Sequence, residues 1–334
     1  MKQEEIEELI KSYGYRVDKE LEKIIEKEVK SDFSKWLNEP IWYHMGTGGK
    51  RLRPALCLLS CELLGGDVEK ALNFALACEI MHNYLLLHDD VMDGDTVRRD
   101  FPTVWVKYGV PNAINAGDYM IAKAYETILK SDLPLEKIKK LIQIFTETLI
   151  KTGEGQALDV NYRAYENLTV EKYLELAELK TGYYLICPVV GGSIVAGVPE
   201  SVIKELWKLG GNLGTSFQIR DDIIDLTEGK GRGGKIGCDI KEGKPSILFA
   251  HALSKANSEE KKKLIKIMKK PRDETTKEDI EWVINLYKKY GTIEFAQQKA
   301  EELAEEALEI IDKIDFEKKD LIKKITEFIV SRKK

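Results

Sequence analysis

Two short acidic motifs give the first indication of chemistry in this chain. Each places three aspartates at positions i, i+1 and i+4, and they are Asp89, Asp90 and Asp93 in HDDVMD and Asp221, Asp222 and Asp225 in RDDIID. On a helix, the first and last aspartate of such a motif lie one turn apart on one face. These carboxylates repel each other unless a cation lies between them, and oxygen ligands shared with a phosphate suit Mg²⁺. The motifs therefore predict Mg²⁺ sites for a phosphorylated substrate.

Apolar segments precede both motifs, NYLLLH before the first and GTSFQIR before the second. A single motif could be a solvated acidic helix end. Two copies with such flanks are hard to explain as surface, and buried carboxylates need partners. We therefore expect both motifs at helix ends that face an interior cavity.

Basic residues follow both motifs or lie in glycine-rich segments. They are Lys50, Arg51 and Arg53 in GGKRLRP, Arg98 and Arg99 in TVRRD, Lys235 in the glycine-rich stretch near residue 233, and Lys244 in EGK. Each cluster alone fits a solvated surface. Together, cationic side chains near carboxylates that can bind Mg²⁺ predict recognition of a diphosphate.

The elements that must position these residues are helices. Apolar residues recur at intervals of three and four along most of the chain, and alternating strand patterns are nearly absent. We expect helices over residues 4–29, 56–64, 71–88, 113–129, 138–151, 169–185, 202–225 and 296–314. No linker or internal repeat divides the chain, so the prediction is an all-α fold: one domain over residues 1–334, a single large bundle of about ten or more helices around a central cavity.

Composition narrows the classes of function. Lys and Arg number 52 against 57 Asp and Glu, and this slightly acidic balance predicts no nucleic-acid partner. The 5 cysteines are too sparse for a disulfide scaffold, and we expect Cys57 and Cys61 in the core. The longest uncharged stretch, 181–199, is broken by Pro188, which predicts a buried helix and no stable membrane insertion. The N-terminal segment is acidic where a signal peptide is basic, so we expect a cytoplasmic protein.

The motifs and their order resemble those of the trans-type isoprenyl diphosphate synthases, also called polyprenyl synthetases. The matching elements are GGKRLRP, E-x-x-H before the first aspartate motif, the arginine pair, Gly155–Gln156, Lys180–Thr181, FQIRDDIID and KEGKPS. The resemblance implies an all-α bundle around a deep cavity, usually as a homodimer. It also implies head-to-tail condensation of isopentenyl diphosphate with an allylic diphosphate.

The resemblance further implies a role for each matching residue. The allylic diphosphate would be gripped by a cluster of Mg²⁺ ions, three with substrate bound, on Asp89, Asp93 and Asp221, with Asp90, Asp222 and Asp225 as secondary ligands. Positive charge at the same diphosphate would come from Arg98, Lys180, Lys235 and Lys244. Isopentenyl diphosphate would be held by Lys50, Arg53, His82 and Arg99. The catalytic residues near the developing allylic cation would be Lys180, Thr181 and Gln218.

Three positions depart from the family pattern. Asp100 stands where the family usually has glycine, which predicts an altered loop after the arginine pair. The chain is one residue short between Lys235 and Asp239, which makes Lys235 a less secure match than Lys244. Ser246 stands where threonine is common.

Product length in this family depends on what blocks the cavity floor below the first acidic motif. Tyr84, the fifth residue before Asp89, is aromatic and its neighbour Leu85 is not. One aromatic residue there resembles enzymes that stop at the twenty-carbon product. We therefore expect geranylgeranyl diphosphate as the main product, with farnesyl diphosphate as a co-product.

The sequence leaves three alternative functions to be weighed. A terpene cyclase, or a prenyltransferase with another acceptor, would use the same ionisation, but cyclases generally replace the second aspartate motif, and Asp225 argues against one. A non-catalytic partner subunit would usually lose acidic ligands, whereas both motifs are intact. An acidic Ca²⁺-binding or scaffold protein would not need Gln218, Lys180–Thr181 or the arginine pair.

Overall fold

The computed structural model describes residues 3–24, 32–227 and 236–331, and nearly all of them are helical. This confirms the expected all-α class. The chain divides into two compact units. The first comprises Met1–Glu147, Cys187–Leu206 and Ile314–Phe328, and the second comprises Thr148–Ile186, Trp207–Lys313 and Ile329–Lys334.

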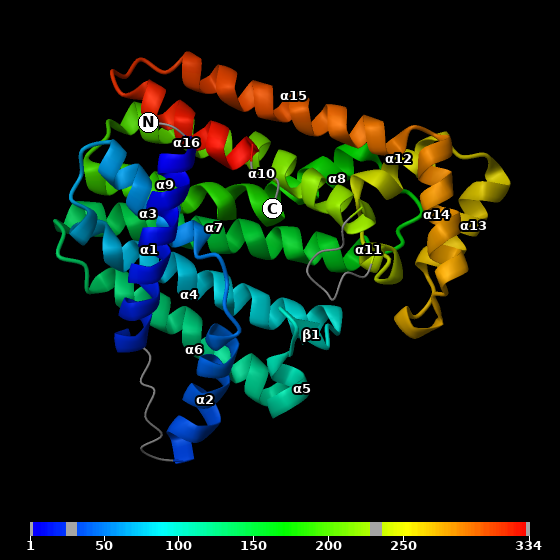
Figure 1. Cartoon of the computed structure of the whole chain (residues 1–334), viewed down its shortest axis with the longest axis horizontal. Helices are drawn as coiled ribbons and strands as arrows, with labels where there is room; N and C mark the ends of the chain where they lie inside the picture. The colour runs from blue at the N-terminus through cyan, green and yellow to red at the C-terminus, as the bar shows by residue number, and fades with distance from the viewer. Residues whose placement is uncertain (1–2, 25–31, 228–235, 332–334) are drawn as a thin grey trace. The chain divides into compact units, whose positions relative to one another are not determined.

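The first unit is built around α4 (Val68–Asp93), which packs against α3 and α6. Its other complete helices are α1 (Gln3–Ile24), α2 (Asp32–Gly46), α3 (Leu52–Leu63), α5 (Val104–Tyr108) and α6 (Val110–Leu129) (Figure 1). In α4, every residue from Phe74 to Met81 is buried, as expected for a helix inside a core. Cys57 and Cys61 are buried in α3, which confirms their prediction as core residues.

The second unit has its own core, formed where α12 packs against α8 and α15. Its complete elements are α8 (Val170–Ala177), the π-helical turn η1 (Glu178–Gly182), α11 (Cys238–Lys241), α12 (Ile247–Lys255), α13 (Ser258–Met268), η2 (Arg272–Glu274), α14 (Lys277–Lys289) and α15 (Thr292–Asp312). The boundary between the units falls within α7 (Leu135–Asn161), α9 (Tyr183–Ala196), α10 (Glu200–Thr227) and α16 (Lys319–Ser331). Side-chain caps start several of these helices, including capping boxes at Asn257 and Thr276.

A tight hairpin follows α4 and was not expected from the sequence. Its strands, β1 (Val97–Arg98) and β2 (Phe101–Pro102), pair antiparallel through the two-residue turn Arg99–Asp100. Both turn residues have positive φ, 52° and 66°, as a two-residue hairpin turn requires. Aspartate adopts this left-handed region more readily than most residues, so Asp100 takes the conformation that glycine usually supplies. The expectation that Asp100 alters the loop is therefore not supported by its backbone.

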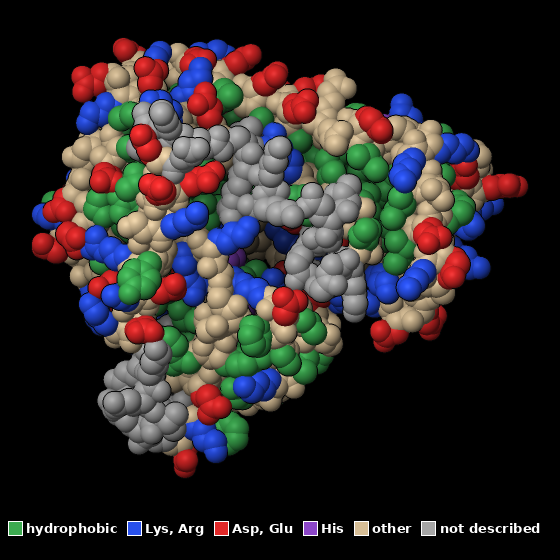
Figure 2. Space-filling model, in the orientation of Figure 1, with side chains coloured by type: hydrophobic (Ala, Val, Ile, Leu, Met, Phe, Trp, Pro, Cys, Tyr) green, Lys and Arg blue, Asp and Glu red, His purple; other side chains and the backbone are tan. Residues whose placement is uncertain are grey.

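In the part of the chain that the structure describes, one helical stretch, Val170–Ala196, is long and apolar enough to cross a membrane. Within it, 72% of the most apolar window is buried inside the structure. A core helix of a globular protein shows this pattern, in agreement with the prediction of a buried helix. On the face drawn in Figure 2, acidic and basic side chains are interspersed over the helices.

Candidate active site

The first aspartate motif occupies the last turns of α4, which ends at Gly94 with φ of 66°. The helix runs five residues beyond the expected end at His88, so the predicted helical spacing of Asp89 and Asp93 is confirmed. Asp93 is buried and Asp89 is partly buried. The carbonyl end of a helix carries partial negative charge, which adds to the repulsion among these carboxylates. A bound cation would offset this repulsion between the carboxylates.

Asp90, the middle aspartate of the motif, is bound by an arginine. Arg98 Nε donates to Asp90 Oδ1 at 2.6 Å, and the side chain of Asp90 is buried. Burial raises the pKa of Asp90 to about 6, although the charge of Arg98 opposes the shift. The hairpin thus attaches Arg98 directly to the acidic end of α4.

The donors at this end of α4 fit Mg²⁺. They are carboxylate oxygens, the ligand type that Mg²⁺ prefers. Among the described residues, no three or more His, Cys, Asp and Glu side chains gather closely enough to hold a metal ion by themselves. This also fits, because Mg²⁺ is usually bound through one or two carboxylates and completed by water and substrate phosphate. Asp89 and Asp93 are the residues of the first unit that would hold it.

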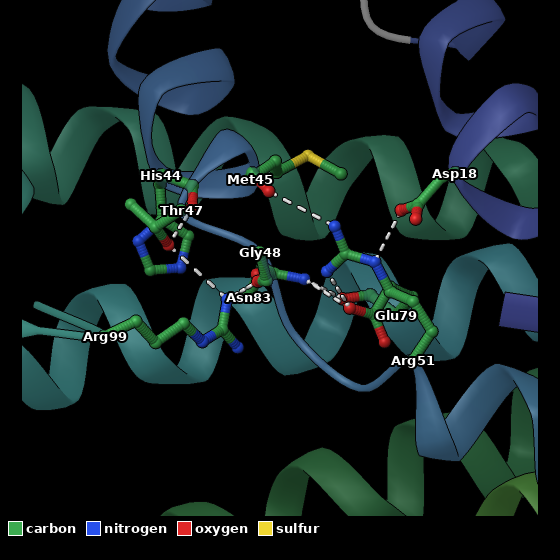
Figure 3. A network of polar contacts seen from close by, with 9 residues as sticks. All are labelled: Asp18, His44, Met45, Thr47, Gly48, Arg51, Glu79, Asn83 and Arg99. Carbon is green, nitrogen blue, oxygen red and sulfur yellow. Dashed lines mark hydrogen bonds and ion pairs between the residues drawn. The ribbon is translucent and has the colours of Figure 1, made fainter. Parts of the chain in front are cut away.

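The glycine-rich loop between α2 and α3 is anchored by Arg51, whose guanidinium is buried (Figure 3). Arg51 Nε donates to Asp18 Oδ1 at 2.6 Å, Nη1 to Glu79 Oε1 at 2.7 Å, and Nη2 to the Met45 carbonyl at 3.2 Å. Burial lowers the pKa of Arg51, but the carboxylates of Glu79 and Asp18 outweigh it and raise the pKa overall. The guanidinium of Arg51 therefore has a structural role. A ligand would be bound by the neighbouring residues Lys50 and Arg53 instead.

Lys50 and Arg53 flank this anchor, and Arg99 reaches the same loop from the hairpin. Arg99 donates to the Gly48 carbonyl, as Figure 3 shows. Lys50 is exposed and Arg53 is partly buried. The first unit therefore brings together Lys50, Arg53 and Arg99, which were predicted to hold one diphosphate.

Two histidines lie among these arginines, and burial together with the arginine charges keeps both of them neutral. Burial lowers the pKa of His82 well below its usual value, and the charges of Arg53, Arg99 and Arg98 lower it further. The pKa of His44 falls to about 3, through burial and then through Arg98, Arg99 and Arg51. Positive charge is thus concentrated around His82, as binding of a polyanion requires.

The depressed pKa of His44 predicts a pH dependence of stability. The unfolded chain protonates this histidine near pH 6.5, but the folded chain does not until about pH 3. Unfolding therefore takes up a proton below pH 6, and the free energy of unfolding falls by about 1.4 kcal/mol per pH unit from this residue. We expect the free energy of unfolding of His44→Gln to fall less than that of wild type when urea unfolding at pH 5 is compared with urea unfolding at pH 7. Parallel pH curves for the two proteins would contradict this account.

In the second unit, the π-helical turn η1 presents Lys180 and Thr181. Single π-turns inside helices are common at functional sites. A side chain on Gly155 of α7 would lie 2.3 Å from the backbone nitrogen of Lys180, and one on Gly214 of α10 would lie 2.2 Å from Gly182 Cα. Only glycine permits such close approach, which accounts for Gly155 in the matched motif. Lys180 Nζ pairs with Asp159 Oδ2 at 2.9 Å.

The second aspartate motif lies within α10, as predicted, but its members have different surroundings. Asp221 is partly buried. Asp222 is buried and accepts from Gln218 Nε2 at 3.0 Å and from the Tyr173 hydroxyl at 2.8 Å. Asp225 is fully buried and accepts from the Asp239 backbone N–H at 3.1 Å, in a small pocket beside the start of α11. Of the three, Asp221 remains the most accessible for a metal ion.

Two lysines complete the predicted set in this unit. Lys244 Nζ pairs with Glu242 Oε2 at 2.9 Å, and Arg272 binds the other oxygen of Glu242 at 3.0 Å. Lys235 lies outside the described residues. Thr181 and Gln218, which were both predicted to lie near the allylic cation, contact each other, and Thr181 Oγ1 donates to Gln218 Oε1 at 2.9 Å.

Comparison with known proteins decides the family. Residues 34–287 match the family model described as polyprenyl synthetase. The chain belongs to the polyprenyl synthetase family.

Individual relatives agree with this assignment. The geranylgeranyl diphosphate synthase of Saccharolobus solfataricus is 37% identical over 316 residues, covering 93% of this chain and 94% of the relative. The geranylfarnesyl diphosphate synthase of Aeropyrum pernix is 32% identical over 296 residues, covering 86% and 91%. The crystal structure of geranylgeranyl pyrophosphate synthetase from Pyrococcus horikoshii superposes with a TM-score of 0.87 at 34% identity, covering 98% and 99% of the two chains.

For this polyprenyl synthetase, two contributors to the site were not predicted as site residues. Glu79, the glutamate of the E-x-x-H motif, binds Arg51, and Tyr173 binds Asp222. The spacing of Glu79 to His82 carried a signal, because a glutamate inside an apolar helical run needs a buried cation. The sequence carried no signal for Tyr173, because an aromatic residue at helical spacing is typical of the hydrophobic core.

Proposed function

We propose that this chain condenses isopentenyl diphosphate head-to-tail with allylic diphosphates in a Mg²⁺-dependent reaction, with geranylgeranyl diphosphate as the main product and farnesyl diphosphate as a co-product. The observation that carries the proposal is the concentration of Arg53, Arg98 and Arg99 around a neutral His82, next to the aspartates that end α4. Membership in the family and the names of the relatives support the same reaction.

The chain's own residues supply most of the proposed mechanism. Asp89, Asp93 and Asp221 would hold Mg²⁺, which would supply positive charge to stabilise the leaving diphosphate. Arg98, Lys180 and Lys244 add positive charge at that diphosphate, and we propose Lys235 for the same role. Lys50, Arg53, His82 and Arg99 hold isopentenyl diphosphate. His82 stays neutral there and donates a hydrogen bond from its ring N–H.

The carbon centre requires different surroundings from the diphosphates. An allylic cation is quenched by water, so its neighbours must be apolar or offer only lone pairs. Thr181 and Gln218 are the polar side chains that we propose lie near it. Thr181 is 7% exposed, which agrees with a site that excludes water.

A product assay tests the reaction. Purified protein with Mg²⁺ and isopentenyl diphosphate is given dimethylallyl, geranyl or farnesyl diphosphate, and chain lengths are read by chromatography. A dominant geranylgeranyl product supports the proposal in full. Longer or shorter products retain the reaction and discard the expected length. No condensation with any starter overturns the proposal.

We propose that Tyr84 forms the floor of the product cavity and so limits the length of the product. The variant Tyr84→Ala should therefore make a longer product. The ring of Tyr84 is partly buried and packs edge-on against His88 at 4.8 Å between centroids. Removing the ring opens space at this depth, so the main product should gain at least one isoprene unit. Tyr119→Ala, on α6, is the control and should leave chain lengths unchanged. An unaltered distribution in Tyr84→Ala would remove Tyr84 from this role.

We further propose that the enzyme is a cytoplasmic homodimer without stable membrane insertion. Large hydrophobic side chains are exposed on the hairpin, α5 and α6, and they are Val97, Phe101, Val106, Val110 and Ile114. Figure 2 shows hydrophobic side chains grouped over α5. An exposed apolar group of this kind is typical of a protein interface. Light scattering on the purified protein tests the assembly, and a monomer at micromolar concentration would exclude it.

A further inference from the structure

A chain of hydrogen bonds in the second unit ends on a tyrosine for which the proposed reaction has no role. Thr181 Oγ1 lies 2.9 Å from Gln218 Oε1, Gln218 Nε2 lies 3.0 Å from Asp222 Oδ1, and the Tyr173 hydroxyl lies 2.8 Å from Asp222 Oδ2. These residues come from η1, α10 and α8. Tyr173 is 1% exposed and Asp222 is 5% exposed, so solvent does not compete for these bonds.

The carboxylate of Asp222 fixes the direction of every bond in the chain. The amide nitrogen of Gln218 can only donate, so it donates to Asp222 Oδ1, and the Tyr173 hydroxyl donates to Asp222 Oδ2. The amide of Gln218 is planar, and its oxygen is then turned toward Thr181. The Thr181 hydroxyl must in turn donate to that oxygen, which leaves the lone pairs of Thr181 for other groups.

We infer that Tyr173 is a positioning residue that acts through Asp222 and Gln218 to orient the hydroxyl of Thr181. The inference rests on the proposed function, in which Thr181 lies beside the developing allylic cation. A hydroxyl that offers lone pairs stabilises a cation, whereas one that turns its hydrogen toward the cation does not.

Tyr173→Phe removes the terminal hydroxyl and keeps the ring in the core. Asp222 then has one donor fewer and holds the amide of Gln218 less firmly. We expect kcat for the condensation to fall about 10-fold, a typical loss for one buried hydrogen bond to a charged group. The KM for isopentenyl diphosphate should stay within about two-fold, because the residues proposed to bind it belong to the first unit.

A double-mutant cycle separates positioning from general loosening of the core. In a Gln218→Leu background, Tyr173→Phe should lower kcat by less than about two-fold, since the chain is already interrupted. Tyr290→Phe is the matched control, because this tyrosine of the second unit also donates its hydroxyl to a carboxylate, that of Glu260, which is not part of the chain. It should leave kcat within about two-fold of wild type. The same roughly 10-fold loss in both backgrounds would overturn the inference.

A second measurement does not depend on turnover. In protein labelled with ¹⁵N-glutamine, the side-chain amide signal of Gln218 is assigned by its loss in Gln218→Leu. Tyr173→Phe should shift this signal and speed its hydrogen exchange, and Tyr290→Phe should do neither. An unmoved Gln218 signal refutes the positioning role. A wild-type protein without condensation activity refutes the proposed function, while the amide signal still decides whether Tyr173 orients Gln218.

Discussion

Asp89→Ala is expected to lower kcat by about 1,000-fold or more while the fold stays intact. The alanine removes a proposed Mg²⁺ ligand, and its neighbours do not replace it, because Asp90 is bound to Arg98 and Asp93 supplies a single carboxylate. Steady-state condensation rates at saturating Mg²⁺, with circular dichroism of the same samples, provide the measurement.

Asp89→Ala should lower the activity but not the stability of the protein. Asp89 lies beside like charges at the negative end of the α4 dipole, so its removal relieves repulsion. Tm should therefore stay the same or rise slightly, by the equivalent of about 0.3–1 kcal/mol. Asp132→Ala, at an exposed carboxylate in the loop before α7, is the control and should keep full activity. Activity within a few-fold of wild type in Asp89→Ala would show that Asp89 does not bind the metal.

Helical periodicity predicted the fold class well, and two of its errors lie at the site. The expected helix over 71–88 ends just before the aspartates, whereas α4 continues to Asp93. The apolar pattern stops there because the last turns carry charged residues for ligands instead of core contacts. The hairpin was missed for a similar reason, since strands of two residues each leave no alternating pattern.

The chemical motifs identified most of the site because residue type and spacing carry that information. They could not distinguish partners that differ in burial. The sequence does not distinguish the three basic residues of GGKRLRP, which are Lys50, Arg51 and Arg53. In the structure, however, Arg51 is buried in an ion pair and Lys50 is exposed. Likewise, Asp222 and Asp225 share a motif with Asp221 but accept hydrogen bonds inside the second unit. Such distinctions depend on tertiary neighbours far along the chain.

The buried pair of Arg51 and Glu79 yields the largest expected effect on stability. Glu79 is 1% exposed, and its Oε1 accepts from Arg51 Nη1 at 2.7 Å and from Asn83 Nδ2 at 3.0 Å. Glu79→Ala leaves a buried guanidinium whose remaining carboxylate, Asp18, has a half-exposed side chain. We expect the free energy of unfolding to fall by about 3–5 kcal/mol in urea denaturation. Glu200→Ala, which breaks the exposed pair with Lys140, should cost less than about 1 kcal/mol.

Replacing both partners separates the structural role of the pair from its role in the site. In Arg51→Met with Glu79→Leu, no buried charge is left alone, and apolar side chains of similar size can recover most of the lost stability. The loop that carries Lys50 and leads into Arg53 of α3 nevertheless loses its anchors on α1 and α4. The KM for isopentenyl diphosphate should therefore stay raised by about 10-fold or more in the stable double variant. A double variant with normal stability and a normal KM would show that Arg51 and Glu79 contribute packing alone. Glu79→Ala within about 1 kcal/mol of wild type would show that the pair is not the anchor of this loop.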